Sequence, residues 1–200
     1  ADISRFMRDV MTGKTATVEK TEKKRGKAVV EGGPGTAART TGLLGGILSY
    51  AVSEGTISIN PAQGVKRPAD GRRARRLDQK EYRRLGKALL TAAEELETEQ
   101  VVQGVWLLAL TGCRLGEIEA LKWSEVDPDH GCFRLADSKE GASVRPIGRA
   151  AFDTLDRIAK RKGSPFVLPA ARSNGSFGGM PSGFERIIEK AKLKGVTPHT

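Results

Sequence analysis

The sequence predicts an α+β fold that is mainly α-helical, with one small antiparallel β-hairpin. Most apolar residues recur at the three- and four-residue spacing of amphipathic helices. The spacing becomes partly alternating in two short segments, 131–136 and 143–147, which predicts two paired strands around a turn. A basic segment with proline and glycine, residues 66–76, interrupts the helical pattern and predicts a linker. We therefore expect a helical first part, 1–65, and a second part, 77–200, that contains the hairpin.

Two helices are expected in the first part. Ile3 to Val10 has the spacing of a helix end, and a second helix is expected over 36–53 with an apolar stripe at 43–52. Between them, the polar and glycine-rich segment 14–35 predicts a long loop. Three glycines weaken the second helix by roughly 1 kcal/mol each relative to alanine, so we expect another backbone, of protein or DNA, to pass close to them. These are Gly42, Gly45 and Gly46.

The second part begins with a clear helix-start signal. Asp78 and Glu81 have the spacing of a capping box, which predicts a helix over 79–96. A buried helix is expected over 101–110, and a short one over 115–123 after a break at Thr111-Gly112. Beyond the hairpin, the pattern predicts an amphipathic helix, a short extended run and a final helix, at 150–161, 166–168 and 181–193.

Net charge indicates a polyanionic partner. The chain has 34 Lys and Arg against 24 Asp and Glu, a net charge of +10. Residues 1–76 hold 15 of these basic residues and 7 acidic ones, and the densest run is 66–76. Such a run is more often a solvated linker, but it is also what a protein that encircles DNA would use to follow the phosphates, and charge alone leaves this choice open. The basic residues that we expect to contact DNA are Lys14, Arg39, Lys66, Arg67, Arg72, Arg73, Arg75 and Arg76.

Several classes of protein are excluded or disfavoured by the sequence. Every apolar run falls short of the ~20 residues of a membrane span, so we expect no membrane partner. Two cysteines, Cys113 and Cys132, do not form a disulfide framework, which favours a reducing cytoplasm. With His130 and His199 they lack the spacing of a zinc site, and the carboxylates do not cluster as a two-metal nuclease requires. We expect no metal and no other cofactor.

The segment 110–127 carries the most specific signal. It reads Leu-Thr-Gly-Cys-Arg-Leu-Gly-Glu-Ile-Glu-Ala-Leu-Lys-Trp-Ser-Glu-Val-Asp and places Arg114 just past a glycine break, with Glu117 one turn later to orient it. An isolated arginine at a helix start is usually part of a surface ion pair. The whole segment, however, resembles the first conserved box of the tyrosine recombinase (phage integrase) family, whose recurring form is T-G-x-R-x-G-E-I-x-x-L-x-W-x-x-V-D.

The remainder of the chain resembles the same family in order and spacing. Ser138-Lys139 followed by 144–147 resembles the family's hairpin lysine and its next strand, and Thr197-Pro-His199 resembles the opening of the second box, H-x-x-R. The first third resembles the later part of the core-binding domain of integrases from mobile elements. The resemblance implies that 1–65 is the C-terminal part of a helical DNA-binding domain, 66–76 the interdomain linker and 77–200 a catalytic domain incomplete at its C-terminus.

The resemblance also implies a function. It implies a site-specific recombinase or integrase of a mobile genetic element, which cleaves and rejoins double-stranded DNA without metal through a 3′-phosphotyrosyl intermediate. Arg114 would stabilise charge on the phosphate, Lys139 would protonate the leaving 5′-oxygen, and His199 would support the phosphate or assist proton transfer, with Glu117 in a supporting role. A tetramer on recombination sites is implied, in a bacterial or phage-encoded, nucleoid-associated protein of the cytoplasm.

The sequence departs from the family pattern after His199. The second arginine of that box and the nucleophilic tyrosine would both follow Thr200, and neither Tyr50 nor Tyr82 stands in the nucleophile's context. We therefore expect these 200 residues to bind DNA but not to cleave it. The alternatives are a non-catalytic DNA-binding or regulatory protein derived from an integrase, a type IB topoisomerase-like enzyme, and a generic helical nucleic-acid adaptor.

Overall fold

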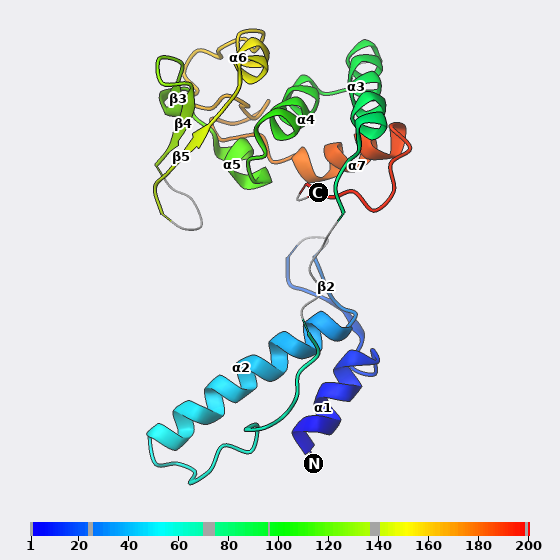
Figure 1. Ribbon diagram of the computed structural model, residues 1–200, viewed down its shortest axis with the longest axis vertical. Helices are drawn as coiled ribbons and strands as arrows, with labels where there is room; N and C mark the ends of the chain where they lie inside the picture. The colour runs from blue at the N-terminus through cyan, green and yellow to red at the C-terminus, as the bar shows by residue number, and fades with distance from the viewer. Residues whose placement is uncertain (1, 24–25, 70–74, 96, 137–140, 199) are drawn as a thin grey trace. The chain divides into compact units, whose positions relative to one another are not determined.

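The computed structural model describes residues 2–23, 26–69, 75–95, 97–136, 141–198 and 200. They belong to two compact units, Ala1–Arg73 and Ala74–Thr200. Helices dominate both units and each unit contains one small antiparallel sheet, which confirms the predicted α+β class (Figure 1). The assignment of a DNA-binding domain, a linker and a catalytic domain to 1–65, 66–76 and 77–200 stays a prediction.

The first unit contains two packed helices. α1 (Asp2–Met11) lies against α2 (Pro34–Ser53), and the contact buries Val10 together with small residues of α2, Ala37, Ala38 and Thr41. The apolar stripe expected over 43–52 does not form the core of this unit, because Leu43 is 68% exposed. Small side chains let the two helices approach closely, so the buried face of α2 is its small-residue face.

A β-hairpin occupies part of the segment 14–35, where the sequence predicted a loop. β1 (Thr17–Lys20) pairs antiparallel with β2 (Lys27–Val30), in the register Thr17 to Val30. All eight strand residues are exposed, so neither face produces the buried alternation by which strands are recognised in a sequence. The loop prediction was wrong for this reason.

The glycines of α2 accommodate another part of the chain. Asn60 Nδ2 donates hydrogen bonds to the carbonyl of Gly45 at 3.0 Å and to Ser49 Oγ at 2.8 Å. A Cβ atom at Gly42 would clash with the guanidinium of Arg67. The neighbours of Gly42 and Gly45 are thus side chains of the segment that follows α2, and a Cβ atom at Gly46 would meet nothing within 4 Å, so the expectation of a second backbone beside these glycines was wrong within the described chain.

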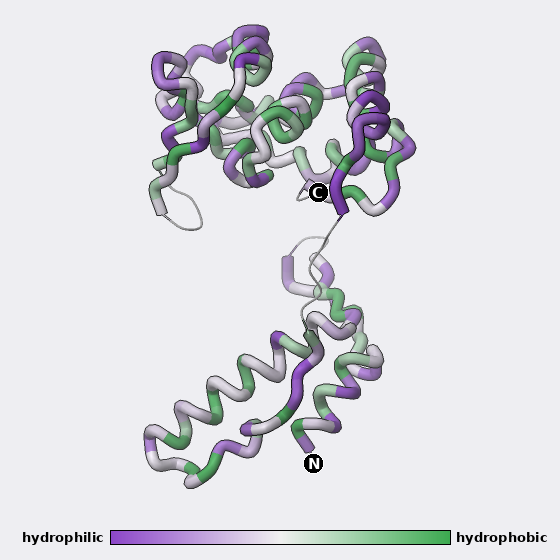
Figure 2. The backbone as a smooth tube through the Cα atoms, in the orientation of Figure 1, coloured by the Kyte–Doolittle hydropathy of each residue, from purple (hydrophilic) through white to green (hydrophobic). Residues whose placement is uncertain are grey.

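The second unit is built around one central helix. α4 (Glu99–Thr111) contacts four other helices, and its green, hydrophobic residues lie at the centre of this unit in Figure 2. The surrounding helices are α3 (Gln79–Glu94), α5 (Leu115–Ala120), α6 (Arg149–Leu155) and α7 (Met180–Lys190). The sheet, in the order β3-β4-β5, consists of β3 (Val126–Asp127), β4 (Cys132–Leu135) and β5 (Ser143–Pro146), and a 3₁₀ turn over Trp123–Glu125 precedes it.

The predicted capping box starts α3. The Asp78 carboxylate accepts the backbone N–H of Glu81 at 2.8 Å, and Glu81 accepts the N–H of Asp78 at 3.1 Å. The Glu81 carboxylate also accepts both terminal nitrogens of Arg75, at 2.6 and 2.7 Å, and chiefly for this reason its pKa falls to about 2. Arg75 therefore anchors the start of α3. No helix in the described part of the chain combines the length and apolar character of a membrane span.

An ion pair connects the segment between α3 and α4 to α7 and makes stability depend on pH. Glu97 accepts Arg186 Nε and Nη2, both at 2.8 Å, and chiefly this bidentate pair lowers its pKa to about 2. A carboxylate with a lowered pKa stabilises the fold above its usual pKa, and this stabilisation disappears as the pH falls towards 2. We expect Glu97→Gln to lose on the order of 1 kcal/mol near pH 7, and progressively less below about pH 4.5, in thermal unfolding.

The control is Glu95→Gln. Glu95 pairs with Lys190, which lies on α7 like Arg186. The Glu95 side chain is 61% exposed, whereas that of Glu97 is 16% exposed. We expect a smaller loss for Glu95→Gln, because solvent screens an exposed pair. An effect of Glu97→Gln that stays constant from pH 7 to pH 2 would contradict the assignment.

Candidate active site

A break between two helices positions Arg114. α4 ends at Thr111 and is capped by Gly112, whose φ of 65° is the left-handed conformation common at helix C-termini. The N–H of Gly112 donates to the carbonyl of Leu108 at 3.0 Å. Thr111 Oγ1 donates a hydrogen bond to the carbonyl of Leu107 at 2.7 Å and accepts one from the backbone N–H of Cys113 at 3.2 Å. Because α5 begins immediately afterwards, Arg114 lies in a short connection fixed at both ends.

Glu117 holds Arg114 by its side chain and its backbone. Its Oε1 accepts Arg114 Nη1 at 3.0 Å, and its Oε2 accepts the Arg114 N–H at 2.9 Å. The Glu117 side chain is only 6% exposed, whereas that of Arg114 is 38% exposed. Burial raises the pKa of Glu117, but the hydrogen bonds outweigh it and the pKa lies below the usual value. Glu117 is therefore a carboxylate that orients a partly exposed guanidinium.

Arg145 also belongs to this site, although nothing in the sequence indicated it. It lies on β5, and its Nη2 donates to the same Oε1 of Glu117 at 3.0 Å. Along β5, Ser143 and Arg145 are half-buried whereas Val144 and Pro146 are exposed. Alternation places Arg145 on the inner face of the strand, but the sequence contains no signal that pairs it with Glu117.

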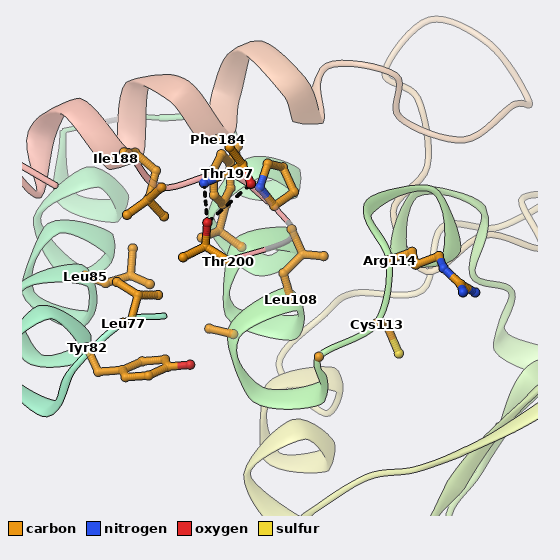
Figure 3. Close-up of a pocket in the computed structure, with 15 residues that line it drawn as sticks. Leu77, Tyr82, Leu85, Leu108, Cys113, Arg114, Phe184, Ile188, Thr197 and Thr200 are labelled. Carbon is orange, nitrogen blue, oxygen red and sulfur yellow. Dashed lines mark hydrogen bonds between the residues drawn. The ribbon is translucent and has the colours of Figure 1, made fainter. Parts of the chain in front are cut away.

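A hollow of about 340 Å³ lies beside Arg114. In Figure 3 the apolar side chains of Leu77, Leu85 and Ile188 lie on one side of it, and the Arg114 guanidinium points away from them. Cys113 lines the same hollow, and burial raises the pKa of its thiol. The cysteine is therefore a protonated, apolar part of the wall.

The structure describes only part of the set of residues that the sequence singled out for catalysis and DNA binding. Lys139 and His199 lie outside the described residues, as do Arg72 and Arg73. The described side chains expected at the catalytic centre are thus Arg114 and Glu117, and these two are in direct contact. Among the described residues, no three His, Cys, Asp or Glu side chains are grouped closely enough to hold a metal ion.

The residues expected to contact DNA are spread over both units. In the first unit, Arg39 and Arg67 line one polar hollow of about 500 Å³, and Lys66 is exposed. Lys14 is also exposed and its Nζ lies 3.3 Å from Asp9 Oδ1. In the second unit Arg75 binds Glu81 as described above, and Arg76 is exposed.

Comparisons with known proteins identify relatives of this chain. The sequence profile of the phage integrase family matches residues 75–200. The shufflon-specific DNA recombinase of Escherichia coli is 34% identical over 120 residues, which cover 58% of this chain and 30% of that protein. The chain spans between 30% and 40% of the length of the curated relatives that it matches.

Solved structures share the fold. A lambda integrase fragment, solved as a dimer bound to a COC′ core site, superposes with a TM-score of 0.64 at 22% identity, over 80% of this chain and 60% of that chain. A lambda integrase tetramer bound to a Holliday junction superposes with a TM-score of 0.62 at 22% identity, over 84% of this chain and 49% of that chain. The α+β arrangement of helices around a small sheet is therefore a known architecture.

Proposed function

Because the chain belongs to the phage integrase family, we propose that the whole protein is a site-specific tyrosine recombinase of a mobile genetic element. It cleaves and rejoins double-stranded DNA through a 3′-phosphotyrosyl intermediate. The observation that carries the proposal is the partly exposed Arg114 guanidinium, held on the buried Glu117 carboxylate within the segment that the family profile matches. The relative with 34% identity is named as a DNA recombinase, which supports the same reaction class.

The chemistry assigned to Arg114 follows from its geometry. When a tyrosine Oη attacks a DNA phosphorus, the P–O5′ bond breaks and negative charge accumulates on the non-bridging oxygens. A guanidinium donates parallel hydrogen bonds to two such oxygens, and one already fixed by Glu117 needs little reorganisation during the reaction. Arg114 thus stabilises the transition state.

Two further residues complete the proposal. Lys139 protonates the 5′-oxygen as it leaves, and His199 supports the phosphate or assists proton transfer. Both roles rest on the sequence motifs. The phosphotyrosyl bond conserves the energy of the phosphodiester, so rejoining needs no nucleotide hydrolysis.

Basic residues outside the catalytic centre bind the DNA backbone. Arg39 and Arg67, which share one hollow, and the exposed Lys66 give sequence-independent affinity that falls with salt. The whole protein assembles as a tetramer on its recombination sites. The lambda integrase tetramer on a Holliday junction supports this assembly.

The test is the polarity of a covalent adduct. The whole protein is incubated with a duplex that carries its recombination site and a nick which releases the 5′-hydroxyl fragment. We expect an adduct that retains a label 5′ of the cut and survives denaturation and EDTA but not protease. An adduct on the 5′-phosphate side, or none on any site taken from the ends of the element, would contradict the proposal.

A further inference from the structure

One buried carboxylate oxygen brings two guanidinium groups together. Glu117 Oε1 accepts Arg114 Nη1 and Arg145 Nη2, each at 3.0 Å. The two nitrogens are therefore separated by no more than twice that distance. They come from different elements, because Arg114 precedes α5 and Arg145 lies on β5.

The charge of this cluster matches a phosphodiester. Arg114 and Glu117 alone are a neutral pair, since the lowered pKa of Glu117 keeps it ionised at neutral pH. Arg145 adds a second positive charge, which leaves the three residues with a net charge of +1. A DNA phosphodiester carries one negative charge, and a phosphoryl transition state carries more. Arg145 therefore makes the site attractive to an anion despite the carboxylate.

We propose that Arg145 is a second phosphate ligand of this site, held beside Arg114 by Glu117. The inference rests on the proposed function, because it names a further contact to the same DNA phosphate. It assigns Glu117 the task of spacing two guanidiniums as well as orienting one. Strand β5, the second strand of the β4–β5 hairpin, thereby contributes to phosphate binding.

The exposure of Arg145 favours phosphate binding over a purely structural ion pair with Glu117. Its side chain is 34% exposed, and within the described part of the chain its guanidinium makes a single hydrogen bond, to Glu117. A guanidinium has five N–H donors, so most of them are available to a bound oxyanion. An arginine that only linked β5 to α5 would not need these exposed N–H groups.

Arg134 on the neighbouring strand provides a matched control. Its Nε lies 2.5 Å from Asp127 Oδ2, and this contact, with that of His130, holds the pKa of Asp127 well below its usual range. Arg134 is 52% exposed and shares Asp127 with no second arginine among the described residues. Replacing it removes one charge and one ion pair from the same sheet without touching Glu117.

The first arm of the test measures the salt dependence of DNA affinity. We compare the unsubstituted chain with Arg145→Gln, Arg145→Lys and Arg134→Gln by fluorescence anisotropy on a short duplex. We expect the slope of log K against log salt to shrink by about 0.9 for Arg145→Gln, the contribution of one phosphate contact, and to be retained by Arg145→Lys and Arg134→Gln. A role in folding alone would change the melting temperature and leave the slope intact.

The second arm does not depend on DNA. Inorganic phosphate is titrated into the chain while arginine side-chain NMR signals are recorded. We expect Arg114 and Arg145 to shift together with one dissociation constant, and Arg134 to stay unchanged. A shift of Arg114 without Arg145, or an unchanged salt slope in a folded Arg145→Gln variant, would overturn the proposal. Failure of the unsubstituted chain to bind DNA while both arginines respond to phosphate would instead contradict the proposed function.

Discussion

Replacing Arg114 by alanine is expected to slow DNA strand cleavage by the whole protein by about 10²- to 10³-fold. The loss is expected in the rate of adduct formation at saturating DNA, because the guanidinium acts on charge that develops in the transition state. The folded state is expected to tolerate the change. The Arg114 side chain is 38% exposed, so its removal leaves no large cavity. The hydrogen bond to Glu117 at the start of α5 comes from the backbone N–H of residue 114, which alanine also provides.

The Arg114→Lys variant tests the geometric part of this argument. Lysine retains the positive charge but lacks the planar fork that holds two phosphate oxygens. We expect its adduct rate to lie between those of alanine and arginine, with a melting temperature equal to that of the unsubstituted protein. A fully active lysine variant would show that charge alone suffices. An alanine variant that cleaves at the normal rate would remove Arg114 from the mechanism.

The elements predicted from the sequence are those with short-range causes. The Asp78–Glu81 capping box depends on residues three apart, and both of its hydrogen bonds are present. The break at Gly112 depends on one residue in the left-handed conformation, and it sets the place of Arg114. The Arg114–Glu117 contact also spans three residues, from the N-cap position of α5 to the first turn of that helix. Local spacing was therefore sufficient for the fold class and for two of the three described site residues, Arg114 and Glu117.

The features that the sequence did not predict depend on long-range contacts or on exposure. Arg145 and Glu117 are 28 residues apart in the chain, and no local sequence pattern predicts the hydrogen bond between them. The hairpin of β1 and β2 has exposed residues on both faces, so its strands lack the alternation of a half-buried sheet. In α2 the buried face consists of small residues such as Ala37, whereas the larger Leu43 is exposed. The large apolar side chains of α2 did not indicate its buried face, because α1 packs closely against the small residues instead.

A close contact between α4 and α7 predicts the largest change in stability. Gly183 on α7 faces Val101 on α4, and a Cβ atom at position 183 would overlap both methyl groups of Val101. Val101 is fully buried and β-branched, so its methyl groups cannot rotate away at low cost. We expect Gly183→Ala to destabilise the second unit by up to about 2 kcal/mol, because overpacking outweighs the better helix propensity of alanine. Thermal and urea unfolding measure this loss.

Gly86→Ala is the matched control, with the opposite expected sign. Gly86 lies inside α3, and a Cβ atom there would meet only the ring of Trp106, at the ordinary contact distance of 3.5 Å. The same substitution should therefore gain up to roughly 1 kcal/mol from helix propensity alone. Opposite shifts of the unfolding midpoint in the two variants would locate the effect in the α4–α7 contact. If both variants were stabilised, Val101 would have to move aside easily, and the tight packing of α7 against α4 would not limit stability.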